Sequence, residues 1–210
     1  MQKKVLIFDF DGTLADTLEV IVKITNDLAE EFGYPPSNQE DLAKIRHLGA
    51  WQVIQRSGVS VFKLPLLVRK LQKRLSQEIE NTNLFPGMQE TLGELKASGH
   101  ILGVVTSNSG ENVHKFLVAH QMQDIFDFVA SSTTLFGKHR TLKKIIAKHH
   151  LDLENTIYIG DETRDIEAAH KIGLEVMAVS WGFNSVEALA THTPEYLIHS
   201  PLDLIKIINK

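Results

Sequence analysis

The sequence predicts an α/β protein: a Rossmann-like parallel sheet as the core, with an all-helical segment inserted after the first strand. From residue 86 onward, short apolar runs alternate with amphipathic helical stretches, a pattern typical of parallel strands joined by right-handed crossovers. Between residues 16 and 84 the apolar residues recur only at helical spacing. We therefore assign residues 1–15 and 86–210 to the core and residues 16–85 to the insertion.

The elements follow in order along the chain. The first strand, Val5–Phe8, is apolar at every position, as in a strand that is buried on both faces of a parallel sheet. Asp16 is the expected N-cap of the first helix, with Glu19 three residues later as in a capping box. Within the insertion, helices are expected at residues 16–32, 39–47, 50–56 and 62–80. In the rest of the core, strands are expected at 101–105, 126–130, 156–159 and 176–179, and helices at 88–97, 111–119, 140–150, 163–172, 184–190 and 201–208.

Composition excludes several classes of function. The chain has 210 residues and a net charge of −4 with histidine neutral, and this charge argues against nucleic acid as its main partner. It contains no cysteine, which excludes thiolate chemistry. Only four apolar residues lie between Lys4 and Asp9, too few for a signal peptide or a membrane span. We therefore expect a cytoplasmic protein without a membrane partner.

Two aspartates, Asp9 and Asp11, follow the first strand directly, at the edge where open α/β sheets bind their ligands. Strand alternation would point both carboxylates the same way, and two like charges so close require a cation or a proton. A metal ion on one carboxylate and a different role for the other would resolve this. An ordinary acidic turn at Gly12 is the competing interpretation, but a turn does not need two acids at the end of a buried strand.

Two further loops carry polar residues that suit phosphate oxygens. Thr106 and Ser107 follow the second core strand and offer hydroxyl and N–H groups ahead of a helix. Ser107 or Asn108 would equally serve as an ordinary cap of that helix. Lys138 follows Phe136 and Gly137 in a later loop that lacks P-loop spacing. Taken alone it fits a solvated lysine better, and it has a role in the site only if the other strand ends converge on it.

A second apolar strand ends in acids, at Gly160-Asp161-Glu162-Thr163-Arg164-Asp165. Asp161 and Asp165 are four residues apart at a helix start, so both can approach one cation. They also fit an N-cap and a first-turn acid favoured by the helix dipole. Together with Asp9 and Asp11, the pattern favours Mg²⁺.

In chain order, Asp9-x-Asp11-Gly12-Thr13, Thr106, Lys138 and Gly160-Asp161-x3-Asp165 resemble the four motifs of the haloacid dehalogenase superfamily of phosphatases. The insertion resembles the helical C1 cap domain of that superfamily, close to phosphoglycolate phosphatases and β-phosphoglucomutases. One departure is that relatives commonly have a proline-rich segment after the motif lysine, which is absent here. Lys143 and Lys144 are therefore alternatives to Lys138.

The resemblance implies a Mg²⁺-dependent phosphatase that acts on a small phosphorylated metabolite such as phosphoglycolate. We expect a monomer or a homodimer. It implies a central first strand flanked by the strands that end at Thr106 and Asp161. Asp9 would be the nucleophile that forms an aspartyl-phosphate, and Asp11 the general acid and base. The implied Mg²⁺ ligands are Asp9, Asp11 through its backbone carbonyl, Asp161 and Asp165; the implied phosphate-binding residues are Thr106, Ser107 and Lys138.

Selectivity would come from the insertion, where Arg46 and His47 precede a glycine break between two helices. Arg46 or His47 would meet an anionic leaving group, although taken alone Arg46 fits a solvated helix-end cation slightly better. The main alternative function is a phosphomutase, which shares every motif and returns the phosphoryl group to a sugar. A receiver-type phosphoacceptor or a non-hydrolytic binding module is the other alternative.

Overall fold

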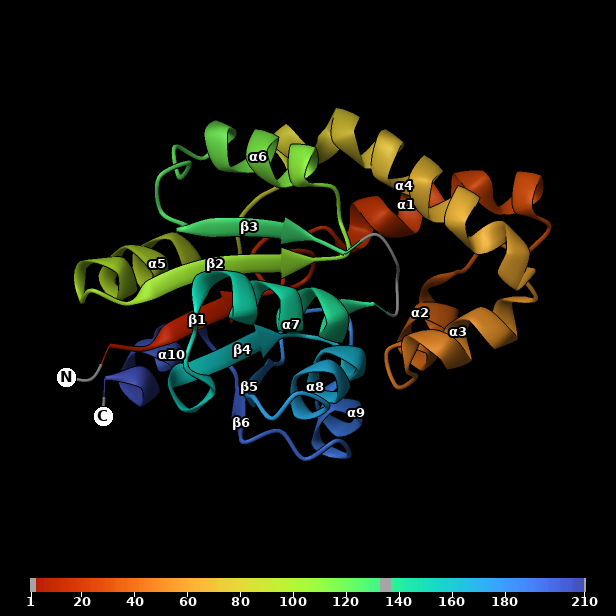
Figure 1. The fold of residues 1–210 in the computed structure, drawn as a ribbon. Helices are drawn as coiled ribbons and strands as arrows, with labels where there is room; N and C mark the ends of the chain where they lie inside the picture. Colours follow the sequence, from red (N-terminus) through yellow and green to blue (C-terminus); the bar gives the residue numbers. More distant parts are fainter. Residues whose placement is uncertain (1–2, 133–136, 210) are drawn as a thin grey trace.

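The computed structural model describes residues 3–132 and 137–209, and these contain one parallel six-stranded sheet in the order β3-β2-β1-β4-β5-β6 (Figure 1). The predicted α/β fold and the central position of the first strand, between β2 and β4, are confirmed. The strand order reverses beside β1, the point at which open sheets of this type bind ligands. The strands are β1 (Val5–Phe8), β2 (Ile101–Thr106), β3 (Phe128–Ser131), β4 (Thr156–Gly160), β5 (Glu175–Val179) and β6 (Tyr196–Ile198).

Alternate residues of β1 enter two separate hydrophobic layers. Leu6 and Phe8 pack into one cluster, and Val5 and Ile7 pack into the other. Both layers exclude water from β1, which explains why the strand is apolar at every position. The first layer is covered by α5 (Met88–Ala97), α6 (Gly110–Ala119) and α10 (Pro201–Ile208), and the second by α7 (Lys138–His149), α8 (Thr163–His170) and α9 (Val186–Ala190).

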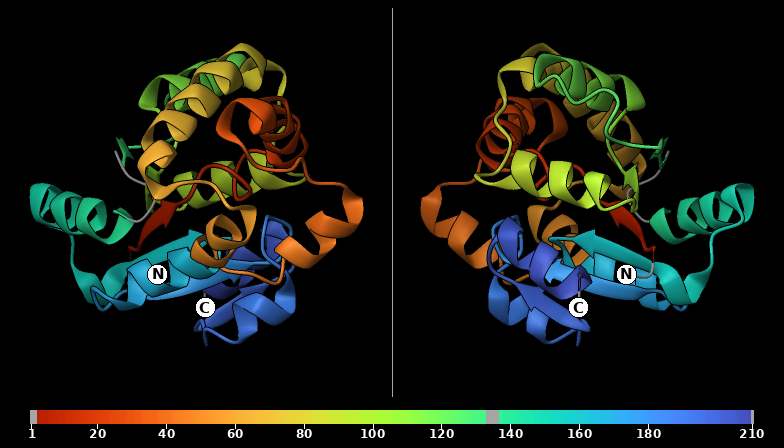
Figure 2. Two further views of the ribbon diagram at one scale, coloured as in Figure 1. Left: turned by 90° about the vertical axis from the view of Figure 1, so that its right-hand side faces the viewer. Right: turned by 90° about the vertical axis from the view of Figure 1, so that its left-hand side faces the viewer.

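The inserted segment contains α1 (Leu18–Phe32), α2 (Gln39–Ile45), α3 (Ala50–Ser57) and α4 (Leu64–Glu78). Helix α1 packs along α4, and α4 also contacts α6 of the core. Helices α2 and α3 lie beyond the carboxyl ends of the strands, whereas both ends of the chain lie at the opposite side of the sheet (Figure 1). The right-hand view of Figure 2 looks onto the side where the chain ends. The insertion therefore stands on the ligand-binding edge of the sheet.

The chain enters and leaves the insertion through one extended bridge between Ala15 and Leu84. The backbone N–H of Asp16 donates to the carbonyl of Asn83 at 2.9 Å, so Asp16 belongs to this bridge. The prediction of Asp16 as the N-cap of the first helix is wrong for this reason. The helix begins at Leu18, with Thr17 at the cap position.

Two further differences concern strands. Strand β6 was not predicted, because three residues with an exposed Tyr196 give too short a pattern to recognise. Strand β3 begins two residues later than expected, because Phe126 packs edge-on against Phe8 outside the sheet.

Within the part of the chain that the structure describes, every helix is too short or too polar to cross a membrane.

Candidate active site

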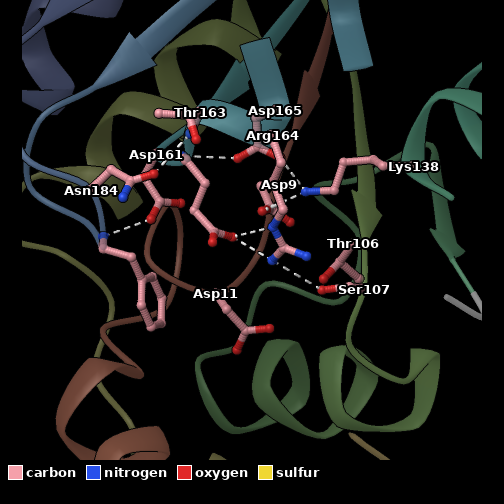
Figure 3. Close-up of polar contacts among 12 residues, drawn as sticks. Asp9, Asp11, Thr106, Ser107, Lys138, Asp161, Thr163, Arg164, Asp165 and Asn184 are labelled. Carbon is pink, nitrogen blue, oxygen red and sulfur yellow. Dashed lines mark hydrogen bonds and ion pairs between the residues drawn. The ribbon is translucent and has the colours of Figure 1, made fainter. Parts of the chain in front are cut away.

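The loops that follow β1, β2 and β4 converge at the carboxyl edge of the sheet (Figure 3). Phe8 lies in register with Val104 on one side and Ile159 on the other, so the three strands end at nearly the same level. The N–H of Asp9 then donates to the carbonyl of Ile159 at 2.8 Å, which extends the ladder by one residue. This register brings Asp9 between the loops that carry Thr106 and Asp161.

Lys138, at the start of α7, is buried against two carboxylates. Its Nζ lies 2.6 Å from Oδ2 of Asp9 and 2.5 Å from Oδ1 of Asp165, and all three side chains are at most 4% exposed. Lys143 and Lys144 are exposed on the same helix. Lys138 is therefore the lysine that the fold brings to the predicted site. Phe136, which precedes it in the predicted loop, lies outside the described residues.

Carboxylate oxygens of Asp9, Glu162 and Asp165 all lie within 4.8 Å of one another. Burial raises the pKa of Asp9 to about 7, against the opposing effect of Lys138. Burial also raises the pKa of Asp161 well above its usual value, and Glu162 and Asp165 raise it further. Burial alone would lower the pKa of Lys138, but Asp165 and Asp9 raise it. The site thus favours additional positive charge, and its oxygen donors fit Mg²⁺.

Asp161 lies beside this group and is held by two hydrogen bonds. Its Oδ1 accepts from the Thr13 hydroxyl at 2.6 Å, and its Oδ2 accepts from the Phe183 N–H at 2.8 Å. A Cβ atom on Gly12 or on Gly182 would collide with the Asp161 carboxylate, and Gly12 also has a φ of 76°. Only glycine at these positions leaves room for Asp161 where the structure has it.

Asp11 faces a different partner from Asp9. Nδ2 of Asn108 lies 3.1 Å from Oδ1 and 3.0 Å from Oδ2 of Asp11. Burial raises the pKa of Asp11 to about 6, and hydrogen bonds from the side chains of Thr17 and Asn108 oppose this shift. Of the two neighbouring acids, one is thus held by an ammonium and the other by an amide, which suits them to different chemical roles.

The loop after β2 presents its polar groups to the same edge. Oγ1 of Thr106 accepts from the Asn108 N–H at 2.9 Å, so the hydroxyl proton of Thr106 can be donated elsewhere. Ser109 caps α6, because its hydroxyl accepts from the backbone N–H of Asn112. Neither Ser107 nor Asn108 is therefore the cap of this helix, so the capping alternative is wrong for both residues.

Asp165 combines two roles at the start of α8. Glu162, not Asp161, is the N-cap of this helix, and Oδ2 of Asp165 accepts from the Glu162 N–H at 3.1 Å in a capping box. Oδ1 of Asp165 meets Lys138. The cap interpretation is therefore wrong for Asp161, whereas Asp165 makes both a capping hydrogen bond and the contact with Lys138.

Glu162 and Arg164 were missed by the sequence interpretation. Nε of Arg164 donates to Oε2 of Glu162 at 2.7 Å, and its Nη2 lies 3.5 Å from the Ser107 hydroxyl. Figure 3 shows the Arg164 side chain reaching from α8 toward Ser107, across the site. The sequence held one signal for Arg164: a cation in the first turn of a helix is unfavourable with the helix dipole, which suggests that it has another partner.

The turn between α2 and α3 docks on the loop after β5. Nη2 of Arg46 donates to the carbonyl of Gly182 at 2.9 Å, and Nδ1 of His47 lies 2.8 Å from the Ser185 hydroxyl. Asn184 was not predicted. Its amide nitrogen donates to the carbonyls of Arg46 and Leu48, and its amide oxygen accepts from the N–H of Thr163. Arg46 therefore contacts the residue directly before Phe183, whose N–H holds Asp161, and His47 contacts Ser185 two residues after Phe183.

Comparison with known proteins agrees with this geometry. Residues 6–179 match the family model described as haloacid dehalogenase-like hydrolase. A phosphoglycolate phosphatase from Synechococcus elongatus is 35% identical over 205 residues, covering 98% of this chain and 97% of that protein. A phosphoglycolate phosphatase from Aliivibrio fischeri is 27% identical and covers 91% and 90%. The crystal structure of a predicted phosphatase from Clostridium acetobutylicum superposes with a TM-score of 0.86 at 21% identity, covering 100% and 99%, and supports the fold.

Proposed function

The chain belongs to the haloacid dehalogenase-like hydrolases, and we propose that it is a Mg²⁺-dependent phosphatase that hydrolyses a small phosphomonoester through an aspartyl-phosphate. Phosphoglycolate is the proposed substrate, as the names of the relatives suggest. The observation that carries the proposal is the buried contact of Lys138 with Asp9. Close to it in the chain lies Asp11, whose carboxylate accepts a hydrogen bond from the side-chain amide of Asn108. Residues 16–85 are the proposed cap.

Asp9 is the proposed nucleophile. Its Oδ1 accepts from the Phe10 N–H at 2.8 Å and its Oδ2 meets Lys138, so the carboxylate is held in one orientation. A carboxylate that attacks a phosphate dianion meets a repulsion of about 4 kcal/mol per charge pair at 4 Å with an effective dielectric near 20. Lys138 offsets part of this repulsion. Thr106 and Ser107 donate hydrogen bonds to the phosphoryl oxygens as the transition state forms.

Asp11 is the proposed general acid and base. In the first half-reaction it donates a proton to the leaving oxygen of the ester. In the second it accepts a proton from the water that attacks the aspartyl-phosphate. A carboxyl group whose pKa is raised to about 6 can both hold and release a proton near neutral pH.

Asp9, Glu162 and Asp165 would hold Mg²⁺, and Asp161 and the Asp11 carbonyl remain proposed ligands from the sequence. When bound, Mg²⁺ supplies positive charge that reduces the repulsion between these acids and the phosphate.

We expect hydrolysis of p-nitrophenyl phosphate to require Mg²⁺ and to fall to background in excess EDTA. The reason is that the buried acids outnumber Lys138 and Arg164, so without a divalent cation they repel the phosphate dianion. The measurement is the release of p-nitrophenol before and after chelation, followed by addition of Mg²⁺. Full activity in excess chelator would contradict the metal assignment.

Arg46 is the proposed contact for an anionic leaving group. Its guanidinium has five N–H donors, and the carbonyl of Gly182 is a partner for Nη2. We expect Arg46→Ala to lower kcat/KM for phosphoglycolate by an amount that corresponds to about 1.5–3 kcal/mol of transition-state free energy, the range of one charged hydrogen bond. The kcat/KM for p-nitrophenyl phosphate should stay nearly unchanged. Equal losses on the two substrates would mean that Arg46 only docks the α2–α3 turn.

A further inference from the structure

A chain of side-chain amides connects helix α4 of the insertion to Asp11. Asn108 donates to the Asp11 carboxylate, and Oδ1 of Asn108 accepts from Nδ2 of Asn112 at 2.9 Å. The same Nδ2 of Asn112 also donates to the backbone carbonyl of Gln72 in α4, at 3.0 Å. Asn108 and Asn112 are 3% and 1% exposed, so the chain is shielded from water.

Two backbone groups fix the orientation of both amides. The carbonyl of Gln72 can only accept, so Asn112 must turn its NH₂ group toward it and toward Asn108. The N–H of Ser109 can only donate, and it lies 2.7 Å from Oδ1 of Asn108. Asn108 must therefore present its NH₂ group to Asp11. A flip of either amide would bring two oxygens or two N–H groups together in a buried site.

Gln72 also holds the loop that carries the proposed phosphate-binding residues. Its side-chain Nε2 donates to the backbone carbonyl of Ser107 at 2.7 Å, while its backbone carbonyl accepts from the side chain of Asn112. One residue of the insertion thus fixes both the loop after β2 and the start of the amide chain. The position of α4 and the position of the Asp11 carboxylate are coupled through these contacts.

We propose that Asn112 is a positioning residue for Asp11, which it holds through Asn108 at the place where the acid exchanges protons with the substrate. This inference rests on the proposed function, because proton transfer by Asp11 matters only if the protein hydrolyses phosphomonoesters. Asn112 itself does not touch Asp11. Its effect should therefore appear only in steps that depend on proton transfer.

Leaving-group dependence tests this role. The variant is Asn112→Leu in the full chain, which keeps the branched shape of asparagine and removes its hydrogen bonds. An alkyl phosphomonoester such as phosphoglycolate, the first to be tested, has a strongly basic alkoxide leaving group that must be protonated by the general acid. By contrast, p-nitrophenolate is a weak base and leaves with little help from an acid. Since general acid catalysis contributes about 10²–10⁴-fold, we expect kcat/KM for the alkyl ester to fall about ten-fold or more. On the same basis, the loss on p-nitrophenyl phosphate should stay under about two-fold.

Lys115→Met is the matched control. Nζ of Lys115 donates to the Ser76 hydroxyl at 2.8 Å, so this variant also removes a contact between α6 and α4 but lies outside the amide chain. This variant should change kcat/KM only slightly, and by the same factor for both substrates. Asn112→Ala, checked by thermal unfolding, replaces the Leu variant if that one does not fold.

Two results would overturn the proposal: equal losses on the two substrates in the folded Asn112 variant, or no loss on either. Failure of the wild-type protein to hydrolyse any phosphomonoester is a different outcome. It would reject the proposed phosphatase activity itself, and the role of Asn112 with it.

Discussion

Replacement of Asp9 by Asn is expected to lower kcat by about 10⁴-fold or more, the scale seen when a nucleophile is removed. An amide oxygen is a poor nucleophile and cannot form the proposed aspartyl-phosphate. The same change removes a negative charge from a buried group that contains Lys138, Glu162 and Asp165. The measurement is the turnover of p-nitrophenyl phosphate together with mass spectrometry for a phosphoryl or beryllofluoride adduct.

Asp11→Asn separates nucleophilic attack from proton transfer. Without the acid, both half-reactions should slow, while Asp9 still forms the beryllofluoride adduct. Asn108 donates to either side chain at this position, so the loop is expected to keep its place. Turnover of Asp9→Asn near the wild-type level would show that the nucleophile is misassigned.

Replacement of Lys138 by Met is expected to have the second largest effect. Removal of one partner from a buried ion pair costs about 3–5 kcal/mol, because an uncompensated charge remains in a dry environment. Lys138 is the ammonium partner of both Asp9 and Asp165, and all three side chains are almost fully shielded from water. We therefore expect a loss of folding stability of this size in chelator, measured by urea unfolding, together with loss of turnover.

Lys143→Met is the matched control, since Lys143 is exposed on the same helix and was one of the alternatives suggested by the sequence. It should leave stability and turnover close to wild type. If instead Lys143→Met abolished turnover and Lys138→Met did not, the assignment of the lysine would be wrong.

The fold was predictable because its signals are local. Each core strand shows as an apolar run, and the acids of the proposed site stand at the strand ends, where a parallel sheet collects ligands whatever the details of packing. The same reasoning predicts the helical insertion. It failed at Asp16, because the backbone of Asp16 is engaged by Asn83, a residue far away in the chain.

The sequence by itself determined the strand-and-helix alternation, the insertion and the pairs of acids at two strand ends, since these depend on periodicity and on residue type. Only the tertiary structure decided which lysine meets Asp9, because Lys138 and Asp9 are 129 residues apart and meet through strand order and register. It also decided that Asn112 presents its NH₂ group to Oδ1 of Asn108. That orientation depends on a carbonyl of α4, and no local pattern records which backbone group a buried amide will face.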